Sequence, residues 1–304
     1  MSLLFFLTQN PENLFFVLYA QDKIVSRPVD IRKNFCYYRN EIIRKTNNAI
    51  TARYQNIGKR EETIMLKGKI AVVTGSAKGI GRATAEIFVR EEVEGIAIVD
   101  YDYETACKTA EELGPAAFPV KCDISDPEQV AAAARLIKDH FGRIDILVNN
   151  AGVTRDAMFH KMTVDQWMKV INTNLNGTFF WCHEVINDMR NQGYGRIINI
   201  SSASVRGVVG QCNYAATKAA MIGFTNTLAK ESAKKGITVN CVAPGATDTD
   251  MYQAVPQHVM DAMIESNPMH RLGKPSEIGE VIAFVASERA SYLNGQWILV
   301  NGGK

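Results

Sequence analysis

Seven short apolar segments alternate with helix-like stretches along most of this chain, and no other feature constrains the fold as strongly. The apolar segments are residues 69–75, 95–100, 116–123, 144–152, 195–202, 237–245 and 296–303. Amphipathic stretches, such as residues 82–92 and 127–141, lie between them. Continuous apolar strands that alternate with helices are typical of a parallel sheet covered on both faces. The sequence therefore predicts an α/β fold over residues 65–304: one doubly wound domain with a seven-stranded parallel sheet and helices on both faces.

Each apolar segment ends in a residue suited to contact a ligand. These residues are Gly75, Asp100, Asp123, Asn149, Ser202, Pro244 with Gly245, and Gly302. In open α/β sheets, ligands bind in the crevice beyond the carboxyl ends of the strands. We therefore expect a binding site along this edge of the sheet.

The segment TGSAKGIG, residues 74–81, connects the first apolar segment to a helix-like stretch. Gly75 permits a tight turn, Gly79 lets the backbone approach a pyrophosphate, and Gly81 lets helix and strand pack closely. The N–H groups of the helix N-terminus would then face phosphate oxygens. Asp100 can accept hydrogen bonds from adenosine ribose hydroxyls, or it is merely a solvated strand end. The arrangement predicts a Rossmann-type dinucleotide site.

Tyr214 and Lys218 lie four residues apart in the Ala-rich segment NYAATK, residues 213–218. On a helix, this spacing puts both side chains on one face. An ammonium beside a phenol lowers the phenol pKa from its ordinary value of about 10, which favours proton donation near neutral pH. The alternative is an exposed lysine beside a half-buried tyrosine.

Four motifs in combination resemble the classical short-chain dehydrogenase/reductase family. They are TGxxxGxG at 74–81, NNAG at 149–152, a serine ahead of Tyr214-x-x-x-Lys218, and VAPG at 242–245. The resemblance covers about residues 66–304. The segments NNAGVTRD, NLNGTF and RLGKPSEIGEVIAFVAS are most similar to the 3-oxoacyl thioester reductases of that family. The resemblance implies hydride transfer between a nicotinamide cofactor and a ketone or secondary alcohol, with reduction of a 3-oxoacyl thioester favoured, and a homotetramer.

The same resemblance implies four catalytic residues. Tyr214 is the acid/base, and Lys218 lowers its pKa and holds the nicotinamide ribose. Ser202 steadies the substrate carbonyl oxygen, and Asn174 anchors a water for the proton relay. Neighbours of the same residue type leave alternatives open: Ser201 and Ser204 for the serine, and Asn172 and Asn176 for the asparagine.

The resemblance also implies a larger set of residues that bind the cofactor. Asp123 and Ile124 resemble the adenine contacts, Asn149 and Gly152 the walls of the groove, and Thr249 the contact of the nicotinamide carboxamide. The complete set is Gly75, Ser76, Lys78, Gly79, Ile80, Gly81, Asp100, Tyr101, Asp123, Ile124, Asn150, Ala151, Gly152, Tyr214, Lys218, Pro244, Gly245, Thr247 and Thr249. Residues 250–269 correspond to a mobile substrate lid.

The preferred cofactor is expected to be NAD(H) rather than NADP(H). Asp100 would place a carboxylate where a 2′-phosphate must lie, and like charges repel. Tyr101 stands where a phosphate-binding protein often carries Arg or Lys. Lys78, in the glycine turn, is the opposing observation.

Two other functions remain open from the sequence. One is a dehydrogenase of the same fold that acts on a sterol, a sugar alcohol or another secondary alcohol. The other is a dinucleotide-binding redox sensor, which would have no use for the set of Ser202, Tyr214, Lys218 and Asn174.

Charge and cysteine content exclude several classes of partner. The net charge is +2, which does not favour nucleic acid, and no apolar stretch is long enough to cross a membrane. The six scattered cysteines are typical of free thiols in a reducing compartment, so we expect a cytoplasmic protein. No metal site is expected, because the five histidines are scattered.

An acyl carrier protein is a doubtful partner. Carrier-binding reductases meet the acidic carrier with a basic cluster. Here Arg190, Lys234 and Lys235 match part of such a cluster, whereas residues 191–193 are neutral. Because only part of the basic cluster is present, we expect weaker electrostatic steering of an acidic carrier protein toward this surface.

Residues 1–64 differ in composition from the rest of the chain, with a single glycine and many Phe, Tyr, Asn, Ile, Arg and Lys residues. Residues 59–62, KREE, can be encoded by AAA-AGG-GAG-GAG, a purine run typical of a bacterial ribosome-binding site, two codons before Met65. We therefore expect Met65 to be the natural start, with 1–64 outside the fold. The alternative is an accessory segment that docks on the domain or a partner.

Overall fold

The computed structural model of the protein describes residues 18–20, 23–25, 65–250 and 255–304. In the first part of the chain, strand β1 (Leu18–Ala20) pairs with β2 (Lys23–Val25) in an antiparallel hairpin. The rest of residues 1–64 lies outside the described residues, and so do the predictions made for it. Cys36 is one of these residues. The other five cysteines are free thiols, and Cys122, Cys182 and Cys241 are buried.

A seven-stranded parallel sheet forms the centre of the compact unit that spans residues 64–304. Its strands are β3 (Ile70–Thr74), β4 (Gly95–Asp100), β5 (Ala117–Lys121), β6 (Ile146–Asn149), β7 (Gly195–Ile200), β8 (Ile237–Pro244) and β9 (Trp297–Val300). They pair in the order β5-β4-β3-β6-β7-β8-β9, and every pairing is parallel. The order reverses direction between β3 and β6, so the predicted doubly wound sheet is confirmed.

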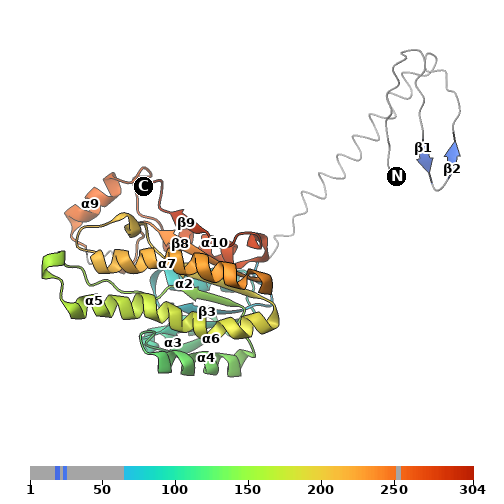
Figure 1. The fold of residues 1–304 in the computed structure, drawn as a ribbon, viewed down its shortest axis with the longest axis horizontal. Helices are drawn as coiled ribbons and strands as arrows, with labels where there is room; N and C mark the ends of the chain where they lie inside the picture. The colour runs from blue at the N-terminus through green and yellow to red at the C-terminus, as the bar shows by residue number, and fades with distance from the viewer. Residues whose placement is uncertain (1–17, 21–22, 26–64, 251–254) are drawn as a thin grey trace, which may run out of the picture. The chain divides into compact units, whose positions relative to one another are not determined.

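Helices cover both faces of this sheet. They are α2 (Gly79–Arg90), α3 (Tyr103–Leu113), α4 (Pro127–Phe141), α5 (Val164–Val170), α6 (Gly177–Gln192), α7 (Cys212–Ser232), α9 (Gln257–Glu265) and α10 (Pro275–Ala286). Four short 3₁₀ helices are also present among the described residues: η1 (Phe159–Lys161), η3 (Ala203–Arg206), η4 (Ala233–Lys235) and η5 (Glu288–Ala290). The element η2 (Ile171–Asn176) is a π-helix. Figure 1 shows α6 and α7 on the side of the sheet nearer to the viewer. None of the described helices is long and apolar enough to cross a membrane.

Two apolar cores, one on each face of the sheet, follow from the alternation of side chains along each strand. On β3, Ala71 and Val73 pack with α2, α3 and α10, whereas Val72 packs on the other face with α4, α6 and α7. The largest buried side chains, Phe88 and Trp181, lie in opposite cores. Leu66 is completely buried in the first core, and Met65 packs against the same core.

Helix α4 shows how local sequence signals set the boundaries of an element. Asp126 caps it by accepting hydrogen bonds from the backbone N–H groups of Glu128 and Gln129, and Pro127 occupies its first turn. Gly142 ends it with a φ of +83°. The helix therefore covers the same residues, 127–141, that its amphipathic pattern predicts.

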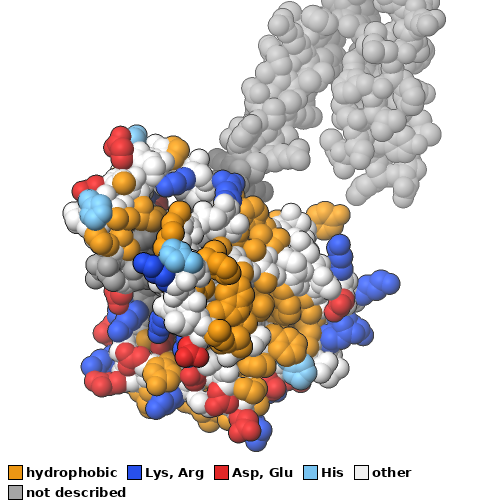
Figure 2. All heavy atoms as spheres, turned by 60° about the vertical axis from the view of Figure 1, so that its left-hand side comes forward, with side chains coloured by type: hydrophobic (Ala, Val, Ile, Leu, Met, Phe, Trp, Pro, Cys, Tyr) orange, Lys and Arg blue, Asp and Glu red, His pale blue; other side chains and the backbone are white. Residues whose placement is uncertain are grey.

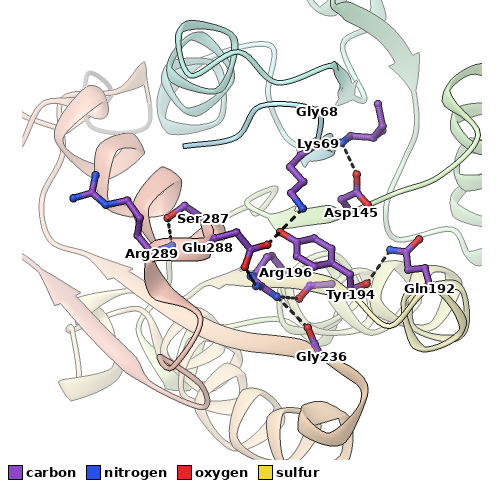
Figure 3. A network of polar contacts seen from close by, with 12 residues as sticks. Gly68, Lys69, Asp145, Gln192, Tyr194, Arg196, Gly236, Ser287, Glu288 and Arg289 are labelled. Atoms are coloured by element: carbon purple, nitrogen blue, oxygen red, sulfur yellow. Dashed lines mark hydrogen bonds and ion pairs between the residues drawn. The ribbon is translucent and has the colours of Figure 1, made fainter. Parts of the chain in front are cut away.

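A network of polar contacts joins the amino ends of the strands (Figure 3). The Tyr194 ring lies between Lys69 and Arg196, whose Nζ and Cζ atoms are 3.6 Å and 4.4 Å from the ring centroid. Arg196 is 4 % exposed, pairs with Glu288 at 3.0 Å and donates to the Gly236 carbonyl at 3.1 Å. We refer to Lys69, Tyr194, Arg196 and Glu288 as the amino-edge network. It joins the starts of β3, β7 and β8 to η5.

Candidate active site

A cavity of about 1050 Å³ opens at the carboxyl edge of the sheet. It brings together most of the residues that the sequence predicts for the site. Those that line it are Gly75, Lys78, Gly79, Ile80, Asp100, Tyr101, Asp123, Ile124, Asn150, Ala151, Gly152, Ser202, Tyr214, Lys218, Pro244, Gly245, Thr247 and Thr249. Ser76, Gly81 and Asn174, also predicted for the site, lie behind its wall.

The glycine turn is shaped by close backbone contacts. Gly75 has a φ of +63°, and a Cβ there would come within 2.8 Å of the Ala151 backbone. A Cβ at Gly81 would come within 2.2 Å of the Gly75 carbonyl oxygen. Asn150 Nδ2 donates to the carbonyls of Thr74 and Gly75, each at 2.9 Å. Gly81 therefore packs the turn from behind, as its role in helix–strand packing requires.

Ser76 and Asn149 also support the site from beneath. Ser76 is completely buried, and its hydroxyl donates to the Val73 carbonyl at 2.7 Å. We expected Asn149 to line the groove, but its side-chain amide donates to Asn199 Oδ1 at 2.9 Å between two strands. Neighbouring strand residues face opposite sides, so Asn150 rather than Asn149 reaches the cavity.

The N-terminus of α2 is left open toward an anion. Its cap residue, Lys78, has no side-chain capping bond, and its first turn carries no acidic residue. The next two helices differ, because Asp102 caps α3 and Asp126 caps α4. Uncapped N–H groups at a helix N-terminus bind phosphate oxygens. The turn and helix therefore fit the pyrophosphate of a dinucleotide.

Asp100 stands at the end of β4, where it lines the cavity. Its Oδ2 accepts from the Ala77 backbone N–H at 3.0 Å, and its Oδ1 accepts from the Asp102 backbone N–H at 3.0 Å. Each carboxylate oxygen can accept a further hydrogen bond. Asp100 therefore both orders the turn and presents acceptors to a ribose hydroxyl.

Asp123 and Ile124 form the next part of the wall. Partial burial alone raises the pKa of Asp123, but hydrogen bonds from the hydroxyl and backbone N–H of Ser125 outweigh it and lower the pKa. The Ile124 carbonyl lies 2.7 Å from the position of a Cβ at Gly177, so α6 begins directly against it. A small residue at 177 lets the two segments approach closely.

Lys218 lies within the wall of the cavity and is 4 % exposed. Its Nζ donates to the Ile200 carbonyl at 2.6 Å and lies 5.5 Å from the centroid of the Tyr214 ring. Desolvation lowers the pKa of Lys218 from 10.5 to about 8. The predicted neighbourhood of Tyr214 and Lys218 on α7 is therefore present.

The three serines at the end of β7 occupy different environments. Ser201 also lines the cavity, but it is only 2 % exposed and its hydroxyl donates to the Lys218 carbonyl at 2.7 Å. Ser202 and Ser204 both line the cavity, and their hydroxyls are 3.0 Å apart. The Ser201 hydroxyl is thus engaged within the protein, whereas Ser204 stays beside Ser202 as the alternative at the cavity.

Asn174 lies in the π-helix η2, directly behind the cavity wall. Its Oδ1 accepts from the Val153 backbone N–H at 2.8 Å, and its Nδ2 donates to the Val153 carbonyl at 3.0 Å. It also lies 3.3 Å from the position of a Cβ at Gly152. π-Helical turns are frequent at functional sites. The alternatives, Asn172 and Asn176, bond to each other at 3.0 Å.

The structure adds residues that the sequence did not single out. Thr173 lines the cavity, and its hydroxyl has no hydrogen-bond partner among the described residues. Near Tyr214, Gln211 Nε2 donates to Asp156 Oδ2 at 2.8 Å, and the Asn213 side chain donates to the Arg155 carbonyl at 2.9 Å. These contacts join two segments about sixty positions apart, and no local pattern reveals them.

Part of the cavity wall is apolar. It is formed by Val208, Val209, Val255, Val259 and Met263. The last three belong to or precede α9, within the predicted lid segment 250–269, of which 251–254 lie outside the described residues. Within the described ranges, no group of His, Cys, Asp and Glu residues could hold a metal ion.

Comparisons with known proteins agree with this geometry. Residues 75–304 match the family model described as Enoyl-(Acyl carrier protein) reductase. The chain is 43 % identical to the acetoacetyl-CoA reductase of Shinella zoogloeoides over 238 residues, which cover 78 % of this chain and 98 % of that protein. It is 42 % identical over 239 residues to the 3-oxoacyl-[acyl-carrier-protein] reductase FabG of Vibrio harveyi, covering 78 % and 98 % of the two chains. Nodulation protein G of Azospirillum brasilense is 44 % identical over 239 residues, covering 77 % and 97 %.

Proposed function

Because the chain belongs to the short-chain dehydrogenase/reductase family, we propose that it reduces the ketone of a 3-oxoacyl thioester to a secondary alcohol. One observation carries this proposal. Ser202, Tyr214 and Lys218 line the same cavity as the glycine turn and the open N-terminus of α2. Proton-donating groups and a dinucleotide cradle therefore face one another across one space.

The reaction follows from the charge that develops on the substrate. When bound, a reduced nicotinamide supplies the hydride to the carbonyl carbon. Ser202 and Tyr214 donate hydrogen bonds to the carbonyl oxygen as it becomes negative, and Tyr214 gives up its phenolic proton. Lys218 stabilises the phenolate electrostatically, because its buried ammonium lies beside the ring. Asn174 holds the Val153 segment that forms the wall beside Lys218 and anchors the water that returns the proton.

The preferred cofactor is NAD(H). Asp100 lines the cavity at the end of β4 and offers acceptors to ribose hydroxyls, whereas a 2′-phosphate there would meet a like charge. Tyr101 lines the same part of the cavity without adding positive charge.

The substrate is a small thioester. The apolar wall of Val208, Val209, Val255, Val259 and Met263 supports a short acyl chain. Acyl carrier protein is a weak partner, because residues 191–193 are neutral beside Arg190, which donates to the Glu231 carbonyl. Acetoacetyl-CoA should therefore be reduced at least as efficiently as the carrier-protein thioester. A much higher kcat/KM with the carrier-protein form, falling steeply as salt rises, would contradict this.

We further propose a homotetramer. Figure 2 shows hydrophobic side chains gathered on the face of the molecule turned toward the viewer. On α5 and α6, Val164, Met168 and Phe179 are 76 %, 43 % and 49 % exposed. Apolar surface of this kind marks association sites. Light scattering after size-exclusion chromatography measures the assembly directly.

Assays of ketone reduction with NADH and with NADPH test the proposed activity. The panel contains acetoacetyl-CoA, a longer 3-oxoacyl-CoA, the carrier-protein thioester, free ketones and secondary alcohols. Reduction of a thioester with NADH is the expected result. Activity confined to free secondary alcohols would assign the protein to the dehydrogenases of this fold instead, and no turnover with any of them would point to a sensor.

A further inference from the structure

Three charged side chains surround the place where the adenosine ribose is expected. Asp100 ends β4, Lys78 occupies the N-cap position of α2, and Asp102 caps α3. Asp100 and Lys78 line the cavity. Asp102 stands immediately outside it, with its backbone N–H donating to Asp100 Oδ1. The net charge of the three side chains is negative.

Lys78 is held by Asp102 rather than by a group within the cavity. Its Nζ lies 3.6 Å from Asp102 Oδ2, and the two side chains are 58 % and 48 % exposed. A lysine ammonium is a strongly hydrated point charge that binds phosphate readily. Pairing with a carboxylate lowers the positive charge that Lys78 presents to the cavity.

Asp102 is the fixed partner of this pair. Its Oδ1 accepts from the Thr105 backbone N–H at 3.2 Å, and its Oδ2 accepts from the Thr105 hydroxyl at 2.7 Å. The Lys78 side chain makes no capping bond, and its long stem is flexible. The position of the ammonium is therefore set by Asp102, which is itself anchored to the first turn of α3.

We infer that Asp102 is a specificity-determining residue for the cofactor, because it holds Lys78 away from a 2′-phosphate. This inference rests on the proposed nicotinamide-dependent function. Asp100 disfavours the phosphate directly, and Asp102 neutralises the one cavity-lining cation beside it. Lys78, which from the sequence alone argues for NADP(H), is thereby converted into a residue compatible with NAD(H).

Asp102→Asn tests this inference, because asparagine keeps the helix cap but loses the charge. We expect the ratio of kcat/KM for NADH to that for NADPH to fall by about 2- to 10-fold, since both the exposed ion pair and the direct repulsion of a phosphate are removed. Asp102→Ser, which also caps helices, should give the same shift. Glu104→Gln is the matched control, because Glu104 pairs with Lys108 on α3 and not with Lys78.

A double-mutant cycle isolates the part played by Lys78. In a Lys78→Ala background, Asp102→Asn should change the selectivity much less than in the wild-type background. Binding of 2′,5′-ADP and of 5′-AMP to the resting protein gives a second readout that needs no turnover. Asp102→Asn should strengthen 2′,5′-ADP binding and leave 5′-AMP binding nearly unchanged.

Two results would overturn the inference. One is unchanged selectivity in both Asp102 variants. The other is a shift that persists at full size without Lys78, which would mean that Asp102 repels the phosphate directly. A wild-type preference for NADPH would instead contradict the proposed cofactor, while the coupling between Asp102 and Lys78 would still be measured by the cycle.

Discussion

The two edges of the sheet use polar side chains in opposite ways. At the amino edge, Arg196 is stacked on Tyr194, paired with Glu288 and bonded to a carbonyl of the next strand. At the carboxyl edge, the N-terminus of α2 is uncapped and the Asp100 carboxylate lines the cavity. Groups satisfied within the protein contribute to stability, whereas groups that face the cavity are available to ligands. Substitutions at the two edges should therefore separate stability from activity.

The largest expected effect is at the carboxyl edge. Tyr214→Phe should lower kcat by about 10²-fold or more, because the phenolic proton donor is lost while the ring is kept. Cofactor binding and the melting temperature should stay close to wild type. Steady-state kinetics measure kcat, cofactor titration measures binding, and thermal unfolding measures the melting temperature. Turnover within a few-fold of wild type would remove Tyr214 from the proposed role.

The amino edge should show the reverse pattern. Arg196→Met should lower the free energy of unfolding by about 1–3 kcal/mol, because buried acceptors lose their donor, with kcat per folded molecule unchanged. Arg90→Met is the matched control: Arg90 also pairs with a glutamate, Glu280, but its side chain is 54 % exposed. The control should cost at most about 1 kcal/mol in urea unfolding. Equal losses in the two variants would show that the amino-edge network is no more than a surface ion pair.

Titration of Lys218 should change both the activity and the stability of the protein, in opposite directions as the pH rises. Desolvation lowers its pKa to about 8, so its charge is lost as the pH rises through that value. Without the cation, Tyr214 becomes a weaker acid, and the rate of ketone reduction should fall above about pH 8. The unfolded chain keeps the ordinary lysine pKa of 10.5 and binds the proton more tightly, so this residue's contribution to stability rises between pH 8 and 10.5.

Lys218→Met provides the reference for that comparison. The difference between wild type and the variant isolates the titration of Lys218 in both the rate profile and the urea-unfolding profile. Rate and stability that fall together above pH 8 in the wild type alone would contradict the assignment.

The smallest expected effect is outside both edges. We propose that Met65 begins the functional chain, because Leu66 is completely buried and the Met65 backbone N–H donates to Glu91 Oε2 at 3.1 Å. The relatives also match about 238 residues of this chain with 98 % of their own length. A protein that starts at Met65 should equal the full chain in kcat/KM and melting temperature. Aggregation or loss of activity would make residues 1–64 a working part of the protein.

The seven strands and the glycine turn were predictable because they depend on local patterns. A buried parallel strand is an apolar run, and a close backbone approach requires glycine whatever the rest of the chain does. The choice between Asn149 and Asn150 was not predictable, because it depends on which face of β6 turns toward the cavity. Thr173 gave no signal either, since a threonine beside Asn174 looks the same in the sequence whether its hydroxyl is bonded or not.

The sequence by itself determined the strand segments, the glycine turn and the neighbourhood of Tyr214 and Lys218, since each is encoded within about ten consecutive residues. Only the tertiary structure decided that the Ser201 hydroxyl bonds to the Lys218 carbonyl, that Asp102 holds Lys78, and that Arg196 reaches Glu288. These contacts join residues on different elements. Their partners are set by strand order and by the packing of helices on the sheet, which no local spacing specifies.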